Sequence, residues 1–354
     1  MTDAAPPSEP SQVDGKPTVL HVPPRAWLLL LALVALAISG LWLLDVSPTW
    51  GDNGFPTESP DLDARWLVRA GERDLVPSLD DAPLLDVNEA QALKLGRKPM
   101  LFPTDRVLGV DLDGQQVCVP LRALNWHEVV NLTLGQRALA LTFSPLADAP
   151  RGYLRGELSL GHSGLLYAST PLLYDRGPTP SLWSQIDGLA RSGPRREQRL
   201  ESIPVEIAQW GDWVARFPET RVVRPAVDER GKFYQRNSYG PYLRSDELRF
   251  PAPEVPGLAP KQRVLVVEAG GVRRVYPQAR VLAQLDLEGL EPGKLHELRW
   301  TTEQGGQPVT FVVHPDPSEA DPACVRVEPP ARLVSEGLWF AVRGFDPELE
   351  LAAE

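Results

Sequence analysis

Cysteine is scarce in this chain, with two residues, Cys118 and Cys324, among 354. Two thiols can form neither a disulfide framework nor a four-thiolate zinc site. Two interpretations of Cys118 stay open. It stands between two valines of an expected strand, where a free cysteine packs as a small hydrophobic side chain, or it pairs with Cys324 in an oxidising compartment.

Basic residues and histidines are also few. Lys and Arg number 36 against 47 Asp and Glu, so the formal net charge is −11. Proteins that bind DNA or RNA neutralise phosphates with clustered Lys and Arg, and no nucleic-acid partner is therefore expected. The five histidines are His21, His127, His162, His296 and His314. None of them forms a His-x-x-x-His pair, so no metal site is predicted. No cofactor is expected either.

Proline, in contrast, is abundant, at 37 of 354 residues. It interrupts helices and favours turns, edge strands and linkers. The hydrophobic fraction of 43% and the charged fraction of 23% are ordinary for a globular protein. We therefore expect a mainly β fold, of the β-rich α+β class, in about two domains.

One segment, residues 26–44, has the properties of a membrane-spanning helix. Its sequence, AWLLLLALVALAISGLWLL, contains no charge and would span about 28 Å as a helix. Trp27 and Trp42 stand near its two ends, where indole rings favour the membrane interface. A buried core helix is an alternative, but no polar stripe interrupts the segment. We therefore expect the lipid bilayer to be a partner of residues 26–44.

A cleaved signal peptide is the second alternative. The apolar run continues through Leu44, past the small residues Ser39 and Gly40, and exceeds a usual signal core, which favours an uncleaved signal-anchor. Arg25 lies before the segment and Asp45 opens an acidic stretch after it. This asymmetry predicts a cytoplasmic N-terminus in a bacterial inner membrane, with a periplasmic or extracytoplasmic body.

Composition and patterning divide the chain into seven expected segments. They are a disordered cytoplasmic tail (1–25), the transmembrane helix (26–44), a linker (45–70), a first β-rich module (71–250), a Pro-rich linker (251–261), a second, related β module (262–345) and an acidic tail (346–354).

The two modules are expected to be related by an internal repeat. Residues 106–111, RVLGVD, are echoed by residues 263–268, RVLVVE, and the same offset relates Pro120 to Pro277. In the first copy Asp113-Gly114 predicts a two-residue hairpin turn. A Gly-Gln turn, at residues 135–136 and 306–307, then precedes an apolar strand in both copies. The alternative is a chance likeness between two ordinary β-hairpins.

The densest polar and aromatic cluster is Asn125-Trp126-His127-Glu128. We expect Asn125 to cap a short helix whose first turn carries Glu128. His127 is either a general base or metal ligand, or a hydrogen-bonded structural histidine. Because adjacent side chains point apart, His127 and Glu128 are not expected to share one metal ion.

Downstream residues complete a candidate pocket. Ser163 lies in Gly161-His162-Ser163-Gly164-Leu165, which fails as a nucleophile elbow at its last position and is expected to be a glycine-flanked turn. Aromatic, amide and hydroxyl side chains that could line a small-molecule site follow soon after. They are Tyr167, Tyr174, Asp175, Trp183, Ser184 and Gln185. Buried aromatic residues with satisfied polar ends are the alternative.

Six strings, taken together, resemble the bacterial domain of unknown function numbered 3179, over about residues 72–345. They are VPSLD (76–80), VLGV (107–110) with PL (120–121), NWHE (125–128) with Asn131, SGLLY (163–167), LYDR (173–176) and SLWSQ (181–185). The resemblance implies an exported, often membrane-anchored protein and no established activity. Its members usually carry Cys-Pro-Leu-Cys or Cys-Pro-Leu-Thr where this chain has Ser144-Pro145-Leu146-Ala147, so thiol chemistry is not expected here.

The functional expectation is a binding or interaction module at the membrane surface, with an unknown protein or small-molecule partner. The alternative is an extracytoplasmic enzyme that uses His127 as general base or metal ligand.

Overall fold

The computed structural model describes residues 52–95, 98–225, 234, 238–315 and 323–353. The predicted cytoplasmic tail and the predicted transmembrane helix lie outside the described residues. No helix within the described ranges is long and apolar enough to cross a membrane. The structure is 41% strand and 14% helix, which confirms the β-rich fold. Residues 50–354 form one compact unit.

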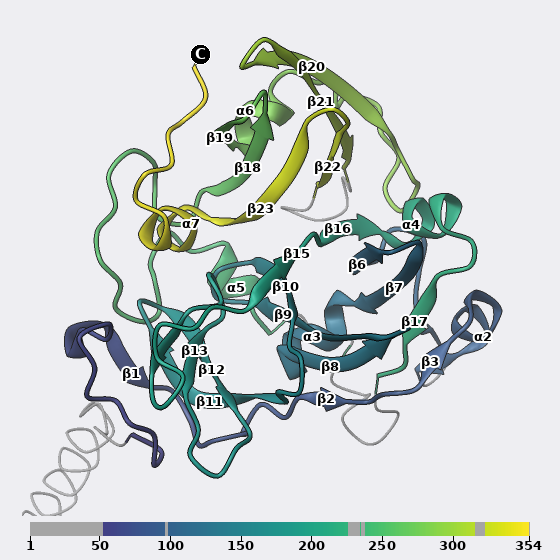
Figure 1. The fold of residues 1–354 in the computed structure, drawn as a ribbon. Coiled ribbons are helices and arrows are strands. Elements are labelled where there is room, and N and C mark those ends of the chain that lie inside the picture. The colour runs from purple at the N-terminus through teal and green to yellow at the C-terminus, as the bar shows by residue number, and fades with distance from the viewer. Residues whose placement is uncertain (1–51, 96–97, 226–233, 235–237, 316–322, 354) are drawn as a thin grey trace, which may run out of the picture. The chain divides into compact units, whose positions relative to one another are not determined.

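Three five-stranded sheets form the first part of this unit (Figure 1). The first has the order β16 (Glu206–Gln209), β6 (Arg106–Leu112), β7 (Gln115–Pro120), β17 (Arg221–Val223) and β3 (Leu84–Leu85). The second has the order β15 (Glu201–Ile203), β10 (Ala149–Leu154), β9 (Arg137–Ser144), β8 (Val129–Leu134) and β2 (Leu79–Asp80). The third has the order β1 (Leu67–Arg69), β11 (Leu160–Tyr167), β12 (Thr170–Asp175), β13 (Leu182–Ser184) and β14 (Ala190–Ser192).

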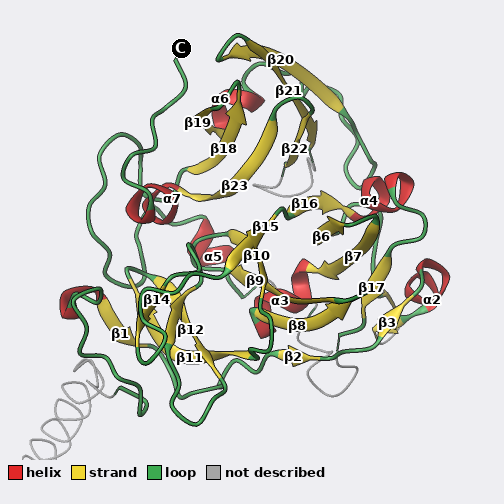
Figure 2. Ribbon diagram, in the orientation of Figure 1, coloured by secondary structure: helices red, strands yellow, loops and turns green. Residues whose placement is uncertain are grey.

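Smaller sheets and short helices complete the described structure (Figure 2). One three-stranded sheet has the order β19 (Val272–Pro277), β18 (Arg263–Ala269) and β23 (Arg332–Leu338), and another has the order β20 (Leu298–Gln304), β21 (Gln307–His314) and β22 (Cys324–Glu328). Strands β4 (Lys94–Leu95) and β5 (Lys98–Pro99) pair with each other. The helices are the 3-10 helix η1 (Ala64–Trp66), α2 (Val87–Ala92), α3 (Leu121–His127), α4 (Trp210–Arg216), α5 (Gly240–Leu243), α6 (Gln278–Leu282) and α7 (Trp339–Phe345).

The main core lies between the first two sheets and follows from strand alternation. Leu108 and Val110 of β6 pack with Val130 of β8 and Leu141 of β9 in one apolar cluster. The opposite face of β6 packs on α4, so both faces of this strand are buried. The hairpin β6–β7 turns at Asp113-Gly114, both with positive φ, as predicted.

The two predicted modules share their connectivity. Val107 faces Pro120 in one hairpin and Val264 faces Pro277 in the other, and a short helix starts directly after each proline. The strand orders β16-β6-β7 and β10-β9-β8 correspond to β23-β18-β19 and β22-β21-β20. The later turn lies at Gly305–Gly306, one residue before the predicted Gly-Gln position. Descent of both segments from one duplicated sequence stays a prediction.

Three segments predicted as linkers or tail are instead packed where the structure describes them. These are residues 45–70, 251–261 and 346–354. Phe55 is buried beside Tyr174, and β1 pairs with β11. Val255 packs with Trp339, and Leu349 joins the same cluster. Scattered apolar residues among prolines and acids bury against surfaces that are formed by distant strands, which local composition does not reveal.

Candidate functional site

Helix α3 places Glu128 at its C-terminal end rather than in its first turn. The helix begins directly after Pro120, because Leu121, Ala123 and Leu124 are the apolar residues that pack inward. The predicted cap at Asn125 is therefore wrong, since Asn125 lies inside the helix. Glu128 adopts the left-handed conformation, with φ 55, which costs roughly 1–3 kcal/mol for a residue other than glycine.

Glu128 is buried against His162 of β11. Its Oε2 lies 3.1 Å from His162 Nε2, and both side chains are 7% exposed. This contact lacks hydrogen-bond geometry, and Oε2 has no hydrogen bond among the described residues. The Gly164 N–H donates to His162 Nδ1 over 3.1 Å, so the imidazole proton resides on Nε2. Glu128 Oε2 can therefore accept a hydrogen bond from a further group.

Tyr239 approaches the other oxygen of the same carboxylate. Its hydroxyl donates to Glu128 Oε1 over 3.5 Å. Burial, and then the nearby Glu128 charge, raises the pKa of Tyr239, so this hydroxyl stays protonated near neutral pH.

His127 points away from Glu128, as predicted for adjacent residues. Its Nδ1 lies 2.8 Å from the Pro77 carbonyl oxygen, which only accepts, so Nδ1 carries the proton. The Tyr234 hydroxyl, 2.5 Å from Nε2, then donates to the other nitrogen. Both nitrogens of His127 are thus hydrogen-bonded in a residue that is 2% exposed. This arrangement favours a structural histidine.

Two adjoining cavities open around these residues. The smaller cavity, about 170 Å³, is lined by Glu128, His162, Tyr239 and Arg249, and by apolar side chains that include Leu75, Val76, Leu146, Leu166 and Phe250. The larger cavity, about 440 Å³, is lined by Asn125, Trp126, His127 and Ser238, and shares Leu75, Val76, Tyr239 and Arg249 with the smaller one. We call the two together the Glu128 cleft. Arg249 is exposed and forms no ion pair with a described residue.

The comparison with known protein families matches most of this chain to a family model. Residues 73–313 match the family described as "Protein of unknown function (DUF3179)", which is more than half of the chain. The chain belongs to the DUF3179 family. The matched span includes every polar residue named in the Glu128 cleft. Neither the curated proteins nor the solved structures contain a match to this chain.

Ser163 and Tyr167 of the DUF3179 domain lie outside the cleft. Ser163 is fully buried in β11, where its hydroxyl donates to the Leu172 carbonyl and accepts from the Leu165 N–H. The predicted glycine-flanked turn is wrong, because this segment is a strand with a register shift between His162 and Leu166. Tyr167 is half-buried and packs edge-on against Phe345.

The remaining candidates of the DUF3179 domain make structural hydrogen bonds. Tyr174 donates to Asp74, and Asp175 accepts from the Ser181 N–H and from Trp183 Nε1. Ser184 accepts from the Asp187 N–H, and Gln185 donates to Thr142 and to the Ala149 carbonyl. The structure therefore brings together Asn125, Trp126, His127 and Glu128, and places the later candidates elsewhere as buried polar groups.

Sequence analysis missed several residues of the cleft, among them His162, Tyr239 and Arg249. His162 was visible beside Ser163, and alternation along a strand would have placed the two on opposite faces. Tyr239 and Arg249 lie more than a hundred positions after Glu128, and no local pattern singles them out.

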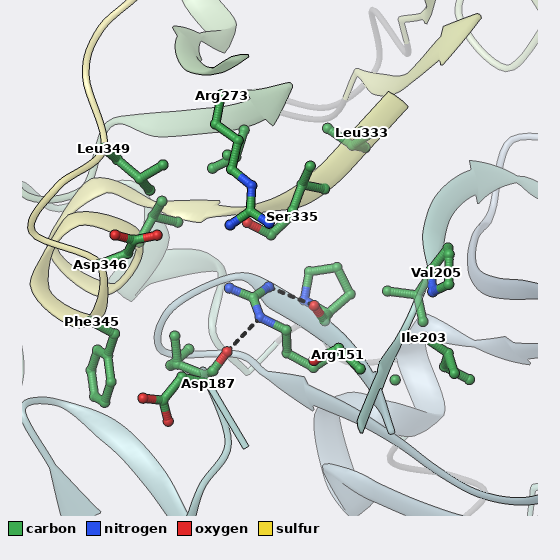
Figure 3. Close-up of a pocket in the computed structure, with 18 of the residues that line it drawn as sticks. Arg151, Asp187, Ile203, Val205, Arg273, Leu333, Ser335, Phe345, Asp346 and Leu349 are labelled. Atoms are coloured by element: carbon green, nitrogen blue, oxygen red, sulfur yellow. Dashed lines mark hydrogen bonds between the residues drawn. The ribbon is translucent and has the colours of Figure 1, made fainter. Parts of the chain in front are cut away.

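A second cavity of the DUF3179 chain, about 510 Å³, surrounds Arg151 (Figure 3). The guanidinium of Arg151 donates to the carbonyls of Pro150, Ile186 and Glu336 and pairs with no described carboxylate. Burial lowers its pKa. Figure 3 shows Arg273 and Ser335 on one side of it and Asp187 on the other. None of the predicted pocket residues line this cavity.

The two cysteines are free and buried in separate clusters. The structure therefore does not contain the disulfide that was left open, and Cys118 is a core residue. Burial raises the pKa of Cys118 and raises that of Cys324 to about 12, so neither thiol is reactive at neutral pH. Ser144 and Ala147, at the positions where the resemblance implies cysteine in other members, are fully buried.

Proposed function

We propose that this DUF3179 protein is a membrane-anchored binding module of the bacterial cell envelope. Residues 26–44 would lie in the cytoplasmic membrane, and the β-rich body would lie on the periplasmic or extracytoplasmic side. A small molecule would occupy the Glu128 cleft. The alternative, an enzyme that uses His127 as general base or metal ligand, is less well supported because both of its ring nitrogens are hydrogen-bonded.

The buried Glu128 carboxylate is the observation that carries this proposal. A buried charge is costly unless hydrogen bonds compensate it. Glu128 has one oxygen without a hydrogen bond among the described residues, on a backbone conformation that is itself unfavourable. A residue kept in this state is typical of a ligand site. An ammonium or hydroxyl group of a ligand would supply the missing donor.

The rest of the Glu128 cleft restricts the class of ligand. Arg249, on the rim, would pair with a carboxylate or phosphate. Leu146, Leu166 and Phe250 line the smaller cavity and would cover an apolar body. The ligand is therefore a small molecule with an apolar body, one donor group and one anionic group.

Three related probes test this class on the full-length chain in lipid nanodiscs. L-phenylalanine carries both polar groups, phenethylamine lacks the carboxylate, and 3-phenylpropionate lacks the amine. Calorimetric titration should show that phenylalanine binds roughly 10- to 100-fold more tightly than either analogue, because one charge-assisted hydrogen bond contributes about 1.5–3 kcal/mol.

Two variants test which residue causes each difference in affinity between phenylalanine and an analogue. Glu128→Gln should abolish the preference for phenylalanine over 3-phenylpropionate, and Arg249→Gln should abolish the preference over phenethylamine. Glu219→Gln, at an exposed acid outside the cleft, should leave all three affinities unchanged. The proposal fails if no probe binds, or if the preferences persist in both cleft variants.

A further inference from the structure

A second group of potential ligands lies away from the Glu128 cleft, between α4 and the strands β20 and β21. It consists of Asp212 in α4, Glu297 directly before β20, and His314, the last residue of β21. One ligand atom from each lies within 4.8 Å of the other two. The residues are far apart in the sequence, which is why the spacing of histidines did not reveal them.

His314 is oriented as a metal ligand would be. Its Nδ1 lies 3.0 Å from the backbone carbonyl of His296, so Nδ1 carries the proton and donates it. The lone pair then resides on Nε2, in a side chain that is 5% exposed. Nε2 has no hydrogen bond among the described residues. Histidines that bind metals commonly donate their other N–H to a carbonyl in this way.

The two carboxylates face the same nitrogen. Asp212 Oδ1 lies 3.5 Å from His314 Nε2, and Glu297 Oε2 lies 4.0 Å from it. Donor atoms around a Zn²⁺ ion with bonds of about 2.1 Å stand roughly 3.0–3.5 Å apart. Each carboxylate oxygen therefore needs to approach His314 Nε2 by at most about 1 Å for the two to share one ion.

In each carboxylate, the oxygen that is not the proposed ligand atom forms an ion pair with an arginine. Arg216 contacts Asp212 Oδ2 at 2.9 Å, and Arg299 contacts Glu297 Oε1 at 2.8 Å. These contacts orient Oδ1 and Oε2 toward His314. Arg326 lies 3.6 Å from Glu297 Oε2 and would compete with a cation there. Coordination therefore requires Glu297 to exchange this loose contact for the metal, while Asp212 and His314 stay in place.

We propose that Asp212, Glu297 and His314 bind one divalent transition-metal ion, for which Zn²⁺ is the matching probe. One imidazole and two carboxylates form a donor set that suits Zn²⁺. Mg²⁺ and Ca²⁺ suit it less well, because they prefer sites in which every ligand is oxygen. The ion connects α4 of the first module with β20 and β21 of the second. Its role is structural, because it links α4 to the hairpin of β20 and β21, which lies far from α4 in the sequence and is joined to it by no disulfide.

Zinc binding to the full-length chain in nanodiscs tests the proposal. The protein is treated with a chelator and dialysed, and ZnCl₂ is titrated by calorimetry while elemental analysis measures bound zinc. One Zn²⁺ per chain is expected, together with a higher melting temperature, because a ligand that binds only the folded state stabilises it. His314→Ala and Asp212→Asn should each weaken binding at least tenfold and abolish the shift in melting temperature.

His296→Ala is the matched control. Its imidazole contacts the Glu291 carbonyl and is half-buried, whereas its backbone carbonyl, which orients His314, is retained in the variant. This variant should bind zinc as the wild type does. Should His314→Ala fail to fold by circular dichroism, Asp212→Asn decides the question. The proposal is overturned if the wild type binds no zinc, or if zinc binding survives in Asp212→Asn.

Discussion

Asp148 and two arginines form a buried charge cluster where the two modules meet. Asp148 Oδ2 lies 2.7 Å from Arg263, and its Oδ1 lies 3.8 Å from Arg106. The arginines are the first residues of β6 and β18 and are related by the predicted repeat. Glu336 lies in the same cluster, and burial raises its pKa to about 7 despite both arginines. A carboxyl group in this state titrates near neutral pH.

Glu336 should make the stability of the protein depend on pH. Its pKa is raised in the folded state from an ordinary value of 4.5, so the folded state binds more protons between these values. The stabilisation is present below about pH 4.5 and is lost as pH rises through about 7, by about 3 kcal/mol for a shift of this size. Chemical unfolding at several pH values measures this effect. As pH rises, the free energy of unfolding should decline less in Glu336→Gln than in the wild type.

Glu219→Gln, at an exposed position, is the control and should retain the wild-type profile. A decline that is equally steep in Glu336→Gln and in the wild type would show that another group causes it.

At the scale of elements, the contact between β6 and α4 depends on one small residue. Gly109 lies in β6 under the indole ring of Trp213, and a Cβ built there would lie 2.4 Å from a ring carbon. Trp213 cannot move away easily, because it is 1% exposed and its Nε1 donates to Thr220 over 3.0 Å. The strand therefore needs glycine at this position to pack against the helix.

Gly109→Ala should destabilise the protein by about 1–3 kcal/mol, because overpacking forces side chains or backbone to shift. Gly177→Ala is the control, since a Cβ at Gly177 would contact nothing within 4 Å. Urea unfolding followed by tryptophan fluorescence measures both. If the two variants were equally stable, the contact between β6 and α4 would be looser than the structure indicates.

At the scale of the whole molecule, the two modules contact each other through corresponding strands. β10 of the first packs on β23 of the second, and β16 of the first packs on β22 of the second. Because β10 corresponds to β22 and β16 to β23, the two contacts are equivalent. The strands β11 to β15, which have no counterpart in the second module, carry His162 of the Glu128 cleft. The proposed ligand site is thus specific to the first module.

The proposed anchor predicts where the full-length protein is found in cells. Residues 26–44 are long and apolar enough to span the bilayer, so the chain should sediment with membranes and resist extraction by carbonate. Replacing both Leu31 and Val34 with arginine should release it, since a charge at the centre of a membrane helix costs roughly 2.5–3.5 kcal/mol. Replacing both with alanine is the control and should leave it in the membrane. Recovery of the wild type in the soluble fraction would refute the anchor.

Local patterns in the sequence predicted the β-rich fold, the Asp113-Gly114 hairpin and the family. Turn geometry, alternation and helix periodicity depend on neighbouring residues, so the sequence contains them directly. It also predicted that His127 and Glu128 point apart. These features do not depend on how distant segments pack.

Tertiary packing alone decided the rest. His162 reaches Glu128 across two sheets, and Tyr239 and Arg249 complete the cleft from a later segment. Asp212, Glu297 and His314 converge from three elements in the same way. Tyr174, Asp175, Trp183 and Gln185 look functional in the sequence, yet hydrogen bonds to partners fixed by the fold make them structural. The reason is that burial and the supply of hydrogen-bond partners depend on which distant strands lie together, and no local pattern records this.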